Sequence, residues 1–352
     1  MSTSVKTRAE LMFGARCGRP PQGVNYASGR VIVLGEELDA AQRRLLAIPT
    51  AEGVACAWGI RPDSLVVVWD MTEGARDSFH QGEYVRSGRS WADFARGACA
   101  HLAEGKRRMP GLDLVLYGDL PRGEGLGASA AYLIVLLRSL YESIGEYRSK
   151  WELCEVVPDI QWEWDDTEAG PLDPFLVAAA KPGQVLDVNC TELDHEVLHM
   201  PEGYELVSED TGYPRTLPSS LYFARQLELA IAGDEVRSLR PEVAELHDLA
   251  RDDLEAIEDE LQDPGRRRLR HIVTGAGRVT DAAHAIVAGD MDQLGRLLNE
   301  GHESLAHDWE SSQPEIDALQ ASLVDRPDVL GATLQGLGWG GRMALLRKTN
   351  GV

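Results

Sequence analysis

The sequence has few cysteines, and they are not arranged as a metal site or a disulfide framework would require. Cys17, Cys56, Cys99, Cys154 and Cys190 are odd in number, and no two of them form a C-x-x-C pair. Structural zinc sites and disulfide-rich domains draw on closely spaced or evenly paired cysteines. We therefore expect neither kind of site, and we expect the thiols to be free and mostly buried.

Long apolar runs are also missing. The longest, such as YLIVLL and SLVVVW, are far shorter than the roughly 20 residues that a membrane-spanning helix needs. Near the N-terminus, no basic segment is followed by an apolar core and a small-residue cleavage site. These absences predict a cytoplasmic protein with no membrane partner.

Basic residues are scarce relative to acidic ones. The 352 residues include 35 Lys and Arg against 57 Asp and Glu, for a net charge of −22. Such a charge repels nucleic acid, so we expect no nucleic-acid partner. An anionic ligand would have to be held by backbone amides, a metal ion and a few well-placed arginines.

The pattern of apolar residues predicts a mixed α/β protein long enough for two domains. The predicted strands are 29–36, 45–59, 64–70, 112–118, 184–189 and 204–210, with helices at 90–105 and about 129–144. The second half is largely helical, with helices expected at 218–233, 241–261, 266–290 and 291–305, and a glycine-rich turn leading into a strand within 331–348. For the run RRRLR at 266–270, a solvated helix face is favoured over a nucleic-acid patch.

One stretch, GDLPRGEGLGASAAYLIVLL at 118–137, joins a predicted strand to a predicted helix through a glycine-rich turn. Gly123, Gly125 and Gly127 allow a tight turn that brings backbone amides close to an anion. The helix that follows directs free N–H groups and its positive dipole end to the same place. Ser129, in the first helical turn, adds a hydroxyl within reach of a metal or phosphate oxygen. The stretch predicts a phosphate-binding loop.

The residues alone leave the kind of loop open. Gly123, Gly125 and Ala128 fit the dinucleotide pattern G-x-G-x-x-A, which also requires an acidic residue about 20 positions later, at the end of a second strand. The corresponding region, IGEYRSKWE, does not resemble a strand. No lysine follows the loop, so the Walker pattern fails. A glycine turn that only packs a helix against a sheet remains an alternative.

Three ordered segments extend the comparison to a known family. LPRGEGLGASAAY (120–132) resembles the GHMP kinase motif Pro-x-x-x-Gly-Leu-(Gly/Ser)-Ser-Ser-Ala. ASGRVIVLGEELD (27–39) resembles the galactokinase signature, and GATLQGLGWGGRMALL (331–346) looks like the third GHMP motif. Between them, AGPLDPFLVAAAKPGQVLDVNC (169–190) follows the galactokinase pattern. The chain is identified as a member of the GHMP kinase superfamily, nearest to galactokinase.

The resemblance implies a two-lobed α/β (α+β) fold with an active site in the cleft between an N-terminal domain, 1–200, and a C-terminal domain, 201–352. It implies transfer of the γ-phosphate of ATP, with Mg²⁺, to a hydroxyl of a sugar or sugar-like polyol, expected to be the anomeric one. Galactose, another sugar and a cyclitol of specialised metabolism are the candidate substrates. A non-catalytic ligand sensor is the alternative of another class. A monomer or homodimer is expected.

The resemblance also assigns the reacting groups. Asp173 would accept or orient the proton of the attacking hydroxyl, and Arg30 would lie beside it, keeping its carboxylate ionised and offsetting charge on the phosphoryl group. Ser129 would support the metal ion. The residues matching the ATP-binding motif are Gly123, Gly125, Leu126, Gly127, Ala128, Ser129 and Ala130, with Ala128 standing where many relatives have a serine.

The sugar-contacting positions depart most from the family pattern. Glu36, Asp39, Gly170 and Tyr222 match sugar-contacting residues of galactokinases, whereas Glu37 replaces a histidine. An ionised glutamate can only accept hydrogen bonds, so adjacent carboxylates favour a ligand rich in donors, such as one with an amine.

Two further substitutions lie outside these sugar-contacting positions. Pro174 stands where the family has a glutamine beside the base, which removes a side-chain amide. In the third motif Arg342 replaces a cysteine. For Arg342 a surface position is favoured over a pair with an acid near the cleft.

Overall fold

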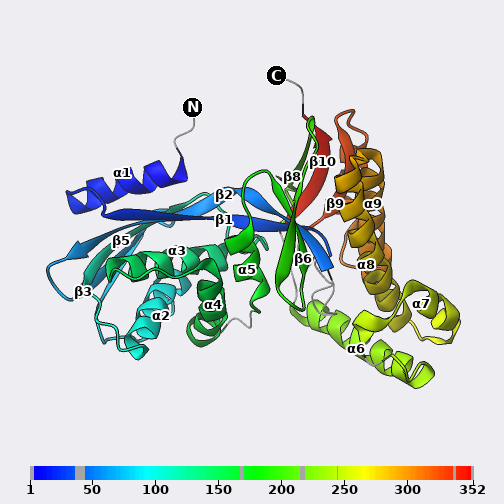
Figure 1. Ribbon diagram of the computed structural model, residues 1–352, viewed down its shortest axis with the longest axis horizontal. Coiled ribbons are helices and arrows are strands. Elements are labelled where there is room, and N and C mark those ends of the chain that lie inside the picture. Colours follow the sequence, from blue (N-terminus) through cyan, green and yellow to red (C-terminus); the bar gives the residue numbers. More distant parts are fainter. Residues whose placement is uncertain are drawn as a thin grey trace. The chain divides into compact units, whose positions relative to one another are not determined.

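The computed structural model describes residues 4–35, 44–166, 170–214, 219–243, 245–335 and 338–349. Their contacts divide the chain into two compact units (Figure 1). Unit 1 comprises Met1–Arg30, Pro49–Arg122 and Leu126–Ala180, and unit 2 comprises Val31–Ile48, Gly123–Gly125 and Lys181–Val352. The mixed α/β class expected from the sequence is confirmed. The boundary expected between residues 200 and 201 stays a prediction.

Unit 1 is a sheet with helices on both faces. Its strands run in the order β4-β3-β5-β2, in which β3 and β5 are parallel and the other neighbours antiparallel, and β1 also pairs with β2. Figure 1 shows α1 on one side of this sheet and α2, α3 and α4 on the other. The elements are α1 Val5–Cys17, β1 Gly23–Leu34, β2 Arg44–Arg61, β3 Leu65–Asp70, β4 Ala75–His80, α2 Ser90–Glu104, β5 Gly111–Gly118, α3 Ala128–Ser143, α4 Lys150–Asp165 and α5 Leu172–Ala179, with β1 and β2 continuing into unit 2. Because both faces are covered, β5 is an almost continuous apolar run.

The N-terminal helix α1 was not predicted from the sequence. The Ser4 side chain accepts a hydrogen bond from the Thr7 N–H at 3.2 Å, and Gly18 ends the helix in the left-handed conformation with φ 67°. Its buried residues Ala9 and Phe13 pack against strand residues of β2 and β5, which are Ala55, Ala57 and Val115. The helix therefore covers an apolar face of the sheet.

Unit 2 contains two groups of strands and a set of helices. The beginning of β2 pairs with β6, and β6 with β7, while β8-β10-β9 form a separate antiparallel sheet. The elements are β6 Gln184–Asn189, β7 Asp194–His199, β8 Tyr204–Asp210, α6 Ser219–Leu239, η2 Leu246–Asp248, α7 Arg251–Ile257, η3 Glu258–Glu260, α8 Gly265–Ala288, α9 Met291–Ser304, the π-helical turn η4 Leu305–Trp309, α10 Pro314–Val324, β9 Val329–Leu334 and β10 Arg342–Lys348. The predicted strands 184–189 and 204–210 match β6 and β8 residue for residue.

One expectation for the helical half was wrong, and a second holds only in part. The helix predicted over 241–261 is broken, because Leu249 and Ala250 have extended backbones with ψ of 108° and 164°. A new helix, α7, begins there, with the Asp253 carboxylate accepting a hydrogen bond from the Ala250 N–H at 3.3 Å. The run at 266–270 is also not simply a solvated face. Arg268 is 1% exposed, and its guanidinium contacts Glu228 at 2.7 Å and Glu310 at 2.6 Å.

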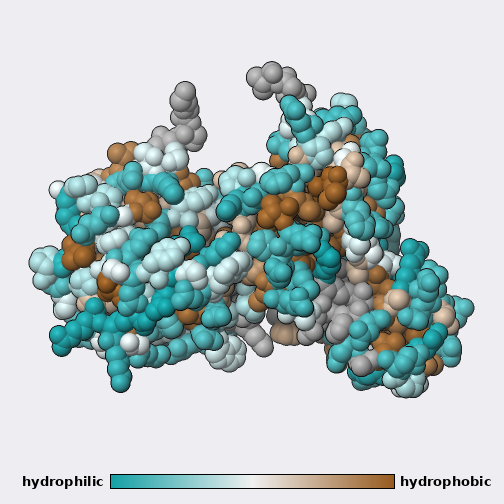
Figure 2. All heavy atoms as spheres, viewed as in Figure 1, coloured by the Kyte–Doolittle hydropathy of each residue, from teal (hydrophilic) through white to brown (hydrophobic). Residues whose placement is uncertain are grey.

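The surface and the thiols fit the composition. The face shown in Figure 2 is mostly hydrophilic, as expected for an acidic protein. All five cysteines are free; Cys56, Cys99 and Cys154 are buried, and burial raises the pKa of each of these three thiols to about 12. In the described part of the chain, no helix combines the length and apolar character needed to cross a membrane.

Candidate active site

The two residues expected to carry the chemistry meet in unit 1. Asp173 lies in the first turn of α5, and its Oδ1 accepts hydrogen bonds from Nε and Nη2 of Arg30, at 2.9 and 2.5 Å. Arg30, on β1, has a side chain only 7% exposed, whereas the Asp173 side chain is 38% exposed. The carboxylate is thus held by a buried cation while remaining open to a ligand.

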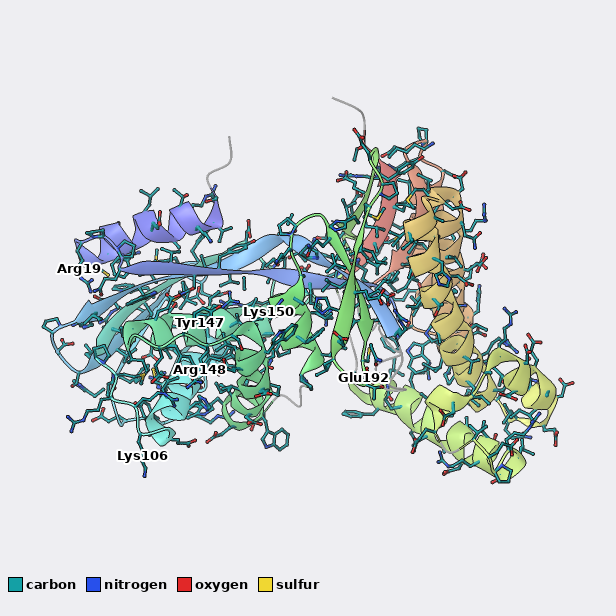
Figure 3. The ribbon with its side chains drawn as sticks, viewed as in Figure 1. Arg19, Lys106, Tyr147, Arg148, Lys150 and Glu192 are labelled. Atoms are coloured by element: carbon teal, nitrogen blue, oxygen red, sulfur yellow. The ribbon has the colours of Figure 1, made fainter. Side chains whose placement is uncertain are left out.

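The helix that carries Asp173 is fixed by aromatic packing. Phe175 stacks on Trp151 of α4, with ring centroids 4.7 Å apart and planes 28° apart. The Lys150 amine lies 4.6 Å from the Trp151 ring centroid, and Figure 3 marks its position near the start of α4. Sequence reasoning did not predict α4, although Ser149 and Glu152 form the Ser-x-x-Glu capping box that signals its beginning.

The glycine-rich segment adopts the backbone expected of a phosphate loop. Gly123, Gly125 and Gly127 have φ of 80°, 70° and 70°, a left-handed conformation that suits glycine. Gly127 is the N-cap of α3, no side chain caps this terminus, and no acidic residue lies in its first turn. The first N–H groups of α3 are therefore not capped by a side chain, which is the arrangement that suits binding of an anion. Ser129 is exposed in that turn.

Within unit 1, the end of the glycine-rich segment is hydrogen-bonded to Arg30. The Arg30 N–H donates to the Leu126 carbonyl at 2.9 Å. A Cβ added to Gly127 would lie 3.1 Å from Arg30 Cγ and 3.1 Å from Val177 Cγ2. The backbone at 126–127 therefore packs directly on Arg30, which in turn holds Asp173. Ala128 is partly exposed and Ala130 is buried.

A buried carboxylate beside the loop was missed by sequence reasoning. Asp70, at the end of β3, is fully buried and accepts hydrogen bonds from Arg122 Nη2 at 2.5 Å and from the Tyr132 hydroxyl at 3.1 Å. Its Oδ1 also accepts from the Thr72 and Glu73 N–H groups, at 3.0 and 3.1 Å. Arg122 comes immediately before Gly123, so this network fixes the chain at the entrance to the loop.

In unit 2, the expectation of a surface position for Arg342 was wrong. The residue was interpreted as a surface arginine, yet it is 9% exposed, and its Nε donates to Oε2 of Glu124 at 3.1 Å. Glu124 belongs to the glycine-rich segment, between Gly123 and Gly125. The alternative interpretation, a pair with an acid, is the one that the structure bears out. The two residues are 218 positions apart, so no local pattern could have linked them.

The residues expected to contact the sugar fall mostly outside the described part of the chain. Glu36, Glu37 and Asp39 lie outside the described residues, as does the side chain of Tyr222. Gly170 is described and is exposed, and a Cβ added there would meet no described atom within 4 Å. Their roles stay predictions.

Metal-binding side chains do not cluster in the described residues: no three of the types His, Cys, Asp and Glu lie close enough to hold an ion. Mg²⁺ differs from many metal ions in keeping several waters and taking few protein ligands, mostly oxygen atoms. The exposed hydroxyl of Ser129 is of a suitable type for such an ion.

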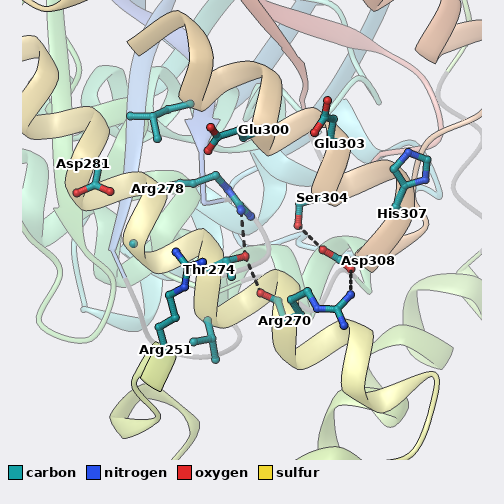
Figure 4. A pocket seen from close by; sticks show the side chains of 13 residues that line it. Arg251, Arg270, Thr274, Arg278, Asp281, Glu300, Glu303, Ser304, His307 and Asp308 are labelled. Carbon is teal, nitrogen blue, oxygen red and sulfur yellow. Dashed lines mark hydrogen bonds and ion pairs between the residues drawn. The ribbon is translucent and has the colours of Figure 1, made fainter. Parts of the chain in front are cut away.

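A cavity of about 450 Å³ lies in unit 2, among α7, α8, α9 and η4 (Figure 4). Arg278 Nη1 donates to Thr274 Oγ1 at 2.9 Å, and Arg270 pairs with Asp308 at 3.2 Å. The basic side chains Arg251, Arg270 and Arg278 share this cavity with the acidic side chains Asp281, Glu300, Glu303 and Asp308. The lining thus has three arginines and four acidic side chains, and it includes none of the predicted site residues.

Comparison with known proteins gives one consistent family. Residues 93–180 match the family described as GHMP kinases N terminal domain. The chain is 29% identical over 335 residues to the galactokinase of Roseiflexus sp. (strain RS-1), covering 94% of this chain and 84% of that protein. It is 29% identical over 334 residues to the galactokinase of Chloroflexus aggregans, covering 92% and 83%.

Solved structures agree on the fold. The crystal structure of Lactococcus lactis galactokinase complexed with galactose aligns with a TM-score of 0.85 at 24% identity, covering 98% of this chain and 90% of that one. The mevalonate kinase of L. major in complex with R-mevalonate aligns with a TM-score of 0.64 at 18% identity, covering 93% and 88%. The matched domain and the galactokinase relatives, which align along nearly the whole chain, make this chain similar to GHMP kinases and, among them, to galactokinases.

Proposed function

We propose that the protein is a galactokinase-like kinase that transfers the γ-phosphate of ATP to a hydroxyl, expected to be the anomeric one, of a sugar or sugar-like polyol. The observation that carries the proposal is the Asp173 carboxylate, held at 2.9 and 2.5 Å by buried Arg30 while still exposed to a ligand. The galactokinase relatives, which align along most of their own length, support the same class.

The arrangement suits phosphoryl transfer, which depends on alignment and charge neutralisation more than on covalent catalysis. Asp173 accepts the proton of the attacking hydroxyl at Oδ2, since Oδ1 is occupied by Arg30. The Arg30 charge pairs with this carboxylate and offsets negative charge that develops on the phosphoryl group.

The nucleotide is assigned to the glycine-rich segment and the start of α3. Backbone amides of Gly123, Gly125, Leu126, Gly127, Ala128, Ser129 and Ala130 would hold the phosphates. When bound, Mg²⁺ would supply positive charge that offsets the negative charge of the phosphates. On the protein side, Ser129 would orient the ion through its hydroxyl, and the uncapped helix N-terminus would receive a phosphate oxygen.

The substrate is proposed as a sugar or cyclitol rather than galactose in particular. Glu36, Asp39, Gly170 and Tyr222 are the proposed contacts with hydroxyl groups, and Glu37 in place of histidine favours a donor-rich ligand. We further propose a cytoplasmic monomer or homodimer, with the family domains at 1–200 and 201–352. Neither nucleic acid nor a membrane is a proposed partner.

The test is ADP release from MgATP across a panel of free sugars, amino sugars and cyclitols, with each product's phosphate position assigned by ³¹P NMR. Turnover with at least one of these compounds, abolished by removing that compound, is the expected result. The Asp173→Asn variant serves as the inactive control. Absence of turnover with every member would contradict the proposal.

The alternative class is a ligand sensor that binds but does not phosphorylate. Measurable binding of a sugar and of MgATP by calorimetry, without ADP release from any combination, would favour it. The presence together of Arg30, Asp173 and Ser129 speaks for catalysis, because a sensor does not need a base held by a buried arginine.

A further inference from the structure

We infer that Arg342 is a positioning residue for nucleotide binding, and that it acts by neutralising Glu124 within the glycine-rich segment. The inference rests on the proposed ATP-dependent activity. It concerns a pair that the family pattern does not supply, since Arg342 stands where the third motif has a cysteine and Glu124 occupies a variable position of the loop motif.

The backbone that carries Arg342 is firmly fixed in unit 2. Arg342 is the first residue of β10, and its carbonyl accepts from the Gln335 N–H at 2.9 Å. The preceding residue, Gly341, accepts from the Thr211 N–H at 2.9 Å and donates its own N–H to the Tyr213 carbonyl at 2.8 Å. The guanidinium therefore extends from a strand end whose backbone is held by hydrogen bonds.

The contact itself is short and shielded from water. Arg342 Nε lies 3.1 Å from Glu124 Oε2, with side chains 10% and 31% exposed. Shielding from solvent weakens screening by salt, so this pair interacts more strongly than an exposed one. A guanidinium suits the position because it is weakly hydrated and stays charged when buried.

The charge of Glu124 is the reason that the pair matters. Glu124 lies between Gly123 and Gly125, two of the residues whose amides are proposed to bind phosphate. An ionised carboxylate on that segment repels a nucleotide that carries several negative charges. Arg342 cancels this repulsion. Among the described residues, Arg342 is the partner with which Glu124 forms an ion pair, so its loss would leave the carboxylate unpaired.

A double-mutant cycle tests the inference on the full-length protein. The variants are Arg342→Gln, Glu124→Gln and both together, and the readouts are KM for MgATP and Kd for MgATP by calorimetry. We expect Arg342→Gln to raise both constants by about tenfold or more, and Glu124→Gln to leave them unchanged or lower. In the double variant, KM and Kd for MgATP are expected to lie within about threefold of their values in Glu124→Gln, because the repelling charge is gone.

Other roles for Arg342 give different results. If Arg342 binds the nucleotide directly, the double variant will bind MgATP as weakly as Arg342→Gln, which overturns the inference. If Arg342→Gln leaves KM and Kd unchanged, the inference is also overturned. A purely structural role would lower the thermal midpoint in step with affinity, and the rescue by Glu124→Gln would then be absent.

Two controls keep the result interpretable. Arg326→Gln removes another ion-paired arginine of unit 2, one that contacts Asp328 at 3.0 Å, and should leave KM for MgATP unchanged. If Arg342→Gln does not fold, the MgATP affinity of Glu124→Gln is measured in 50 and 500 mM salt instead. An affinity that matches or exceeds that of the wild type supports the inference. A tenfold loss of affinity overturns it. Wild-type protein that neither binds nor turns over MgATP refutes the proposed function itself, and the inference with it.

Discussion

Arg30 contacts one carboxylate oxygen of Asp173 with two of its nitrogens, and through its own N–H it also contacts the Leu126 carbonyl. A single residue thus holds the proposed base with its side chain and the end of the phosphate loop with its backbone. Because its side chain is 7% exposed, the guanidinium has little freedom to leave Asp173.

Replacing Asp173 by asparagine removes the proton acceptor and keeps the shape of the side chain. We expect turnover to fall by roughly 10²–10⁴, with little change in MgATP affinity. Initial rates of ADP release and calorimetric titration with MgATP measure the two effects. Asp63→Asn, which removes another carboxylate bound by an arginine, is the matched control and should retain activity. An unchanged rate for Asp173→Asn would remove this residue from the mechanism.

Replacing Arg30 by lysine keeps a positive charge and loses the planar group that supplies both hydrogen bonds to Oδ1. Lysine is a poor substitute where two nitrogens of one guanidinium bind together. We expect turnover to fall by about tenfold or more, roughly the effect of 1.4 kcal/mol or more in the transition state. Rates of ADP release at saturating substrate provide the measurement, and wild-type turnover in this variant would show that the second hydrogen bond is dispensable.

Gly127 and Gly123 form a natural pair for testing the loop. Both have positive φ, but only at Gly127 would a Cβ meet neighbours, Arg30 Cγ and Val177 Cγ2, at 3.1 Å. We expect alanine to cost about 1–2 kcal/mol of stability at either position through backbone strain. Only Gly127→Ala should also disturb Arg30 and lower turnover. Urea unfolding and ADP-release assays measure the two quantities, and equal losses of turnover would contradict the difference.

We expect the free energy of unfolding to fall as the pH is lowered, because His271 is buried in its neutral form. Burial lowers the pKa of His271 to about 3, while in the unfolded chain it titrates near 6.5. Between these values the unfolded state binds one more proton than the folded state, so stability decreases as pH falls below 6.5, by up to about 1.4 kcal/mol per pH unit. Burial also lowers the pKa of His302, which acts in the same direction.

The measurement is urea unfolding at several values between pH 7 and pH 4. His271→Gln should flatten the pH dependence relative to wild type, whatever its effect on stability at pH 7. His284→Gln, on the exposed face of the same helix α8, is the control. An unchanged slope in His271→Gln would assign the acid sensitivity to other groups.

The sequence allowed the strands and motifs to be predicted where local pattern decides the structure. The segments QVLDVN and YELVSED have compact apolar patterns, and they are β6 and β8 with identical ends. The three glycines precede helix α3 in a left-handed conformation and Ser129 lies in its first turn, as their spacing predicted. Helix α4 carried a capping box that was overlooked, so its omission was a failure of interpretation and not of information.

The remaining features depend on distant contacts. Asp70 appeared to be an ordinary strand end, and only the fold brings Arg122 and Tyr132 to its carboxylate. The pair of Arg342 and Glu124 spans 218 positions. The break at Leu249 and Ala250 interrupts an amphipathic pattern that is otherwise continuous, and nothing in composition marks it. Such features depend on contacts between residues that are far apart in the chain, and the local pattern of one sequence does not reveal these contacts.

Helix α1 has a practical consequence for anyone who produces this protein. Ala9 and Phe13 are completely buried against β2 and β5, and Arg8 donates to the Tyr117 hydroxyl at 2.7 Å. A protein expressed from a start site inside this helix would expose apolar residues of β2 and β5 to solvent, and such a surface promotes aggregation. Affinity tags therefore belong ahead of Ser4, and versions shortened at the N-terminus should keep Ser4 and the whole of α1.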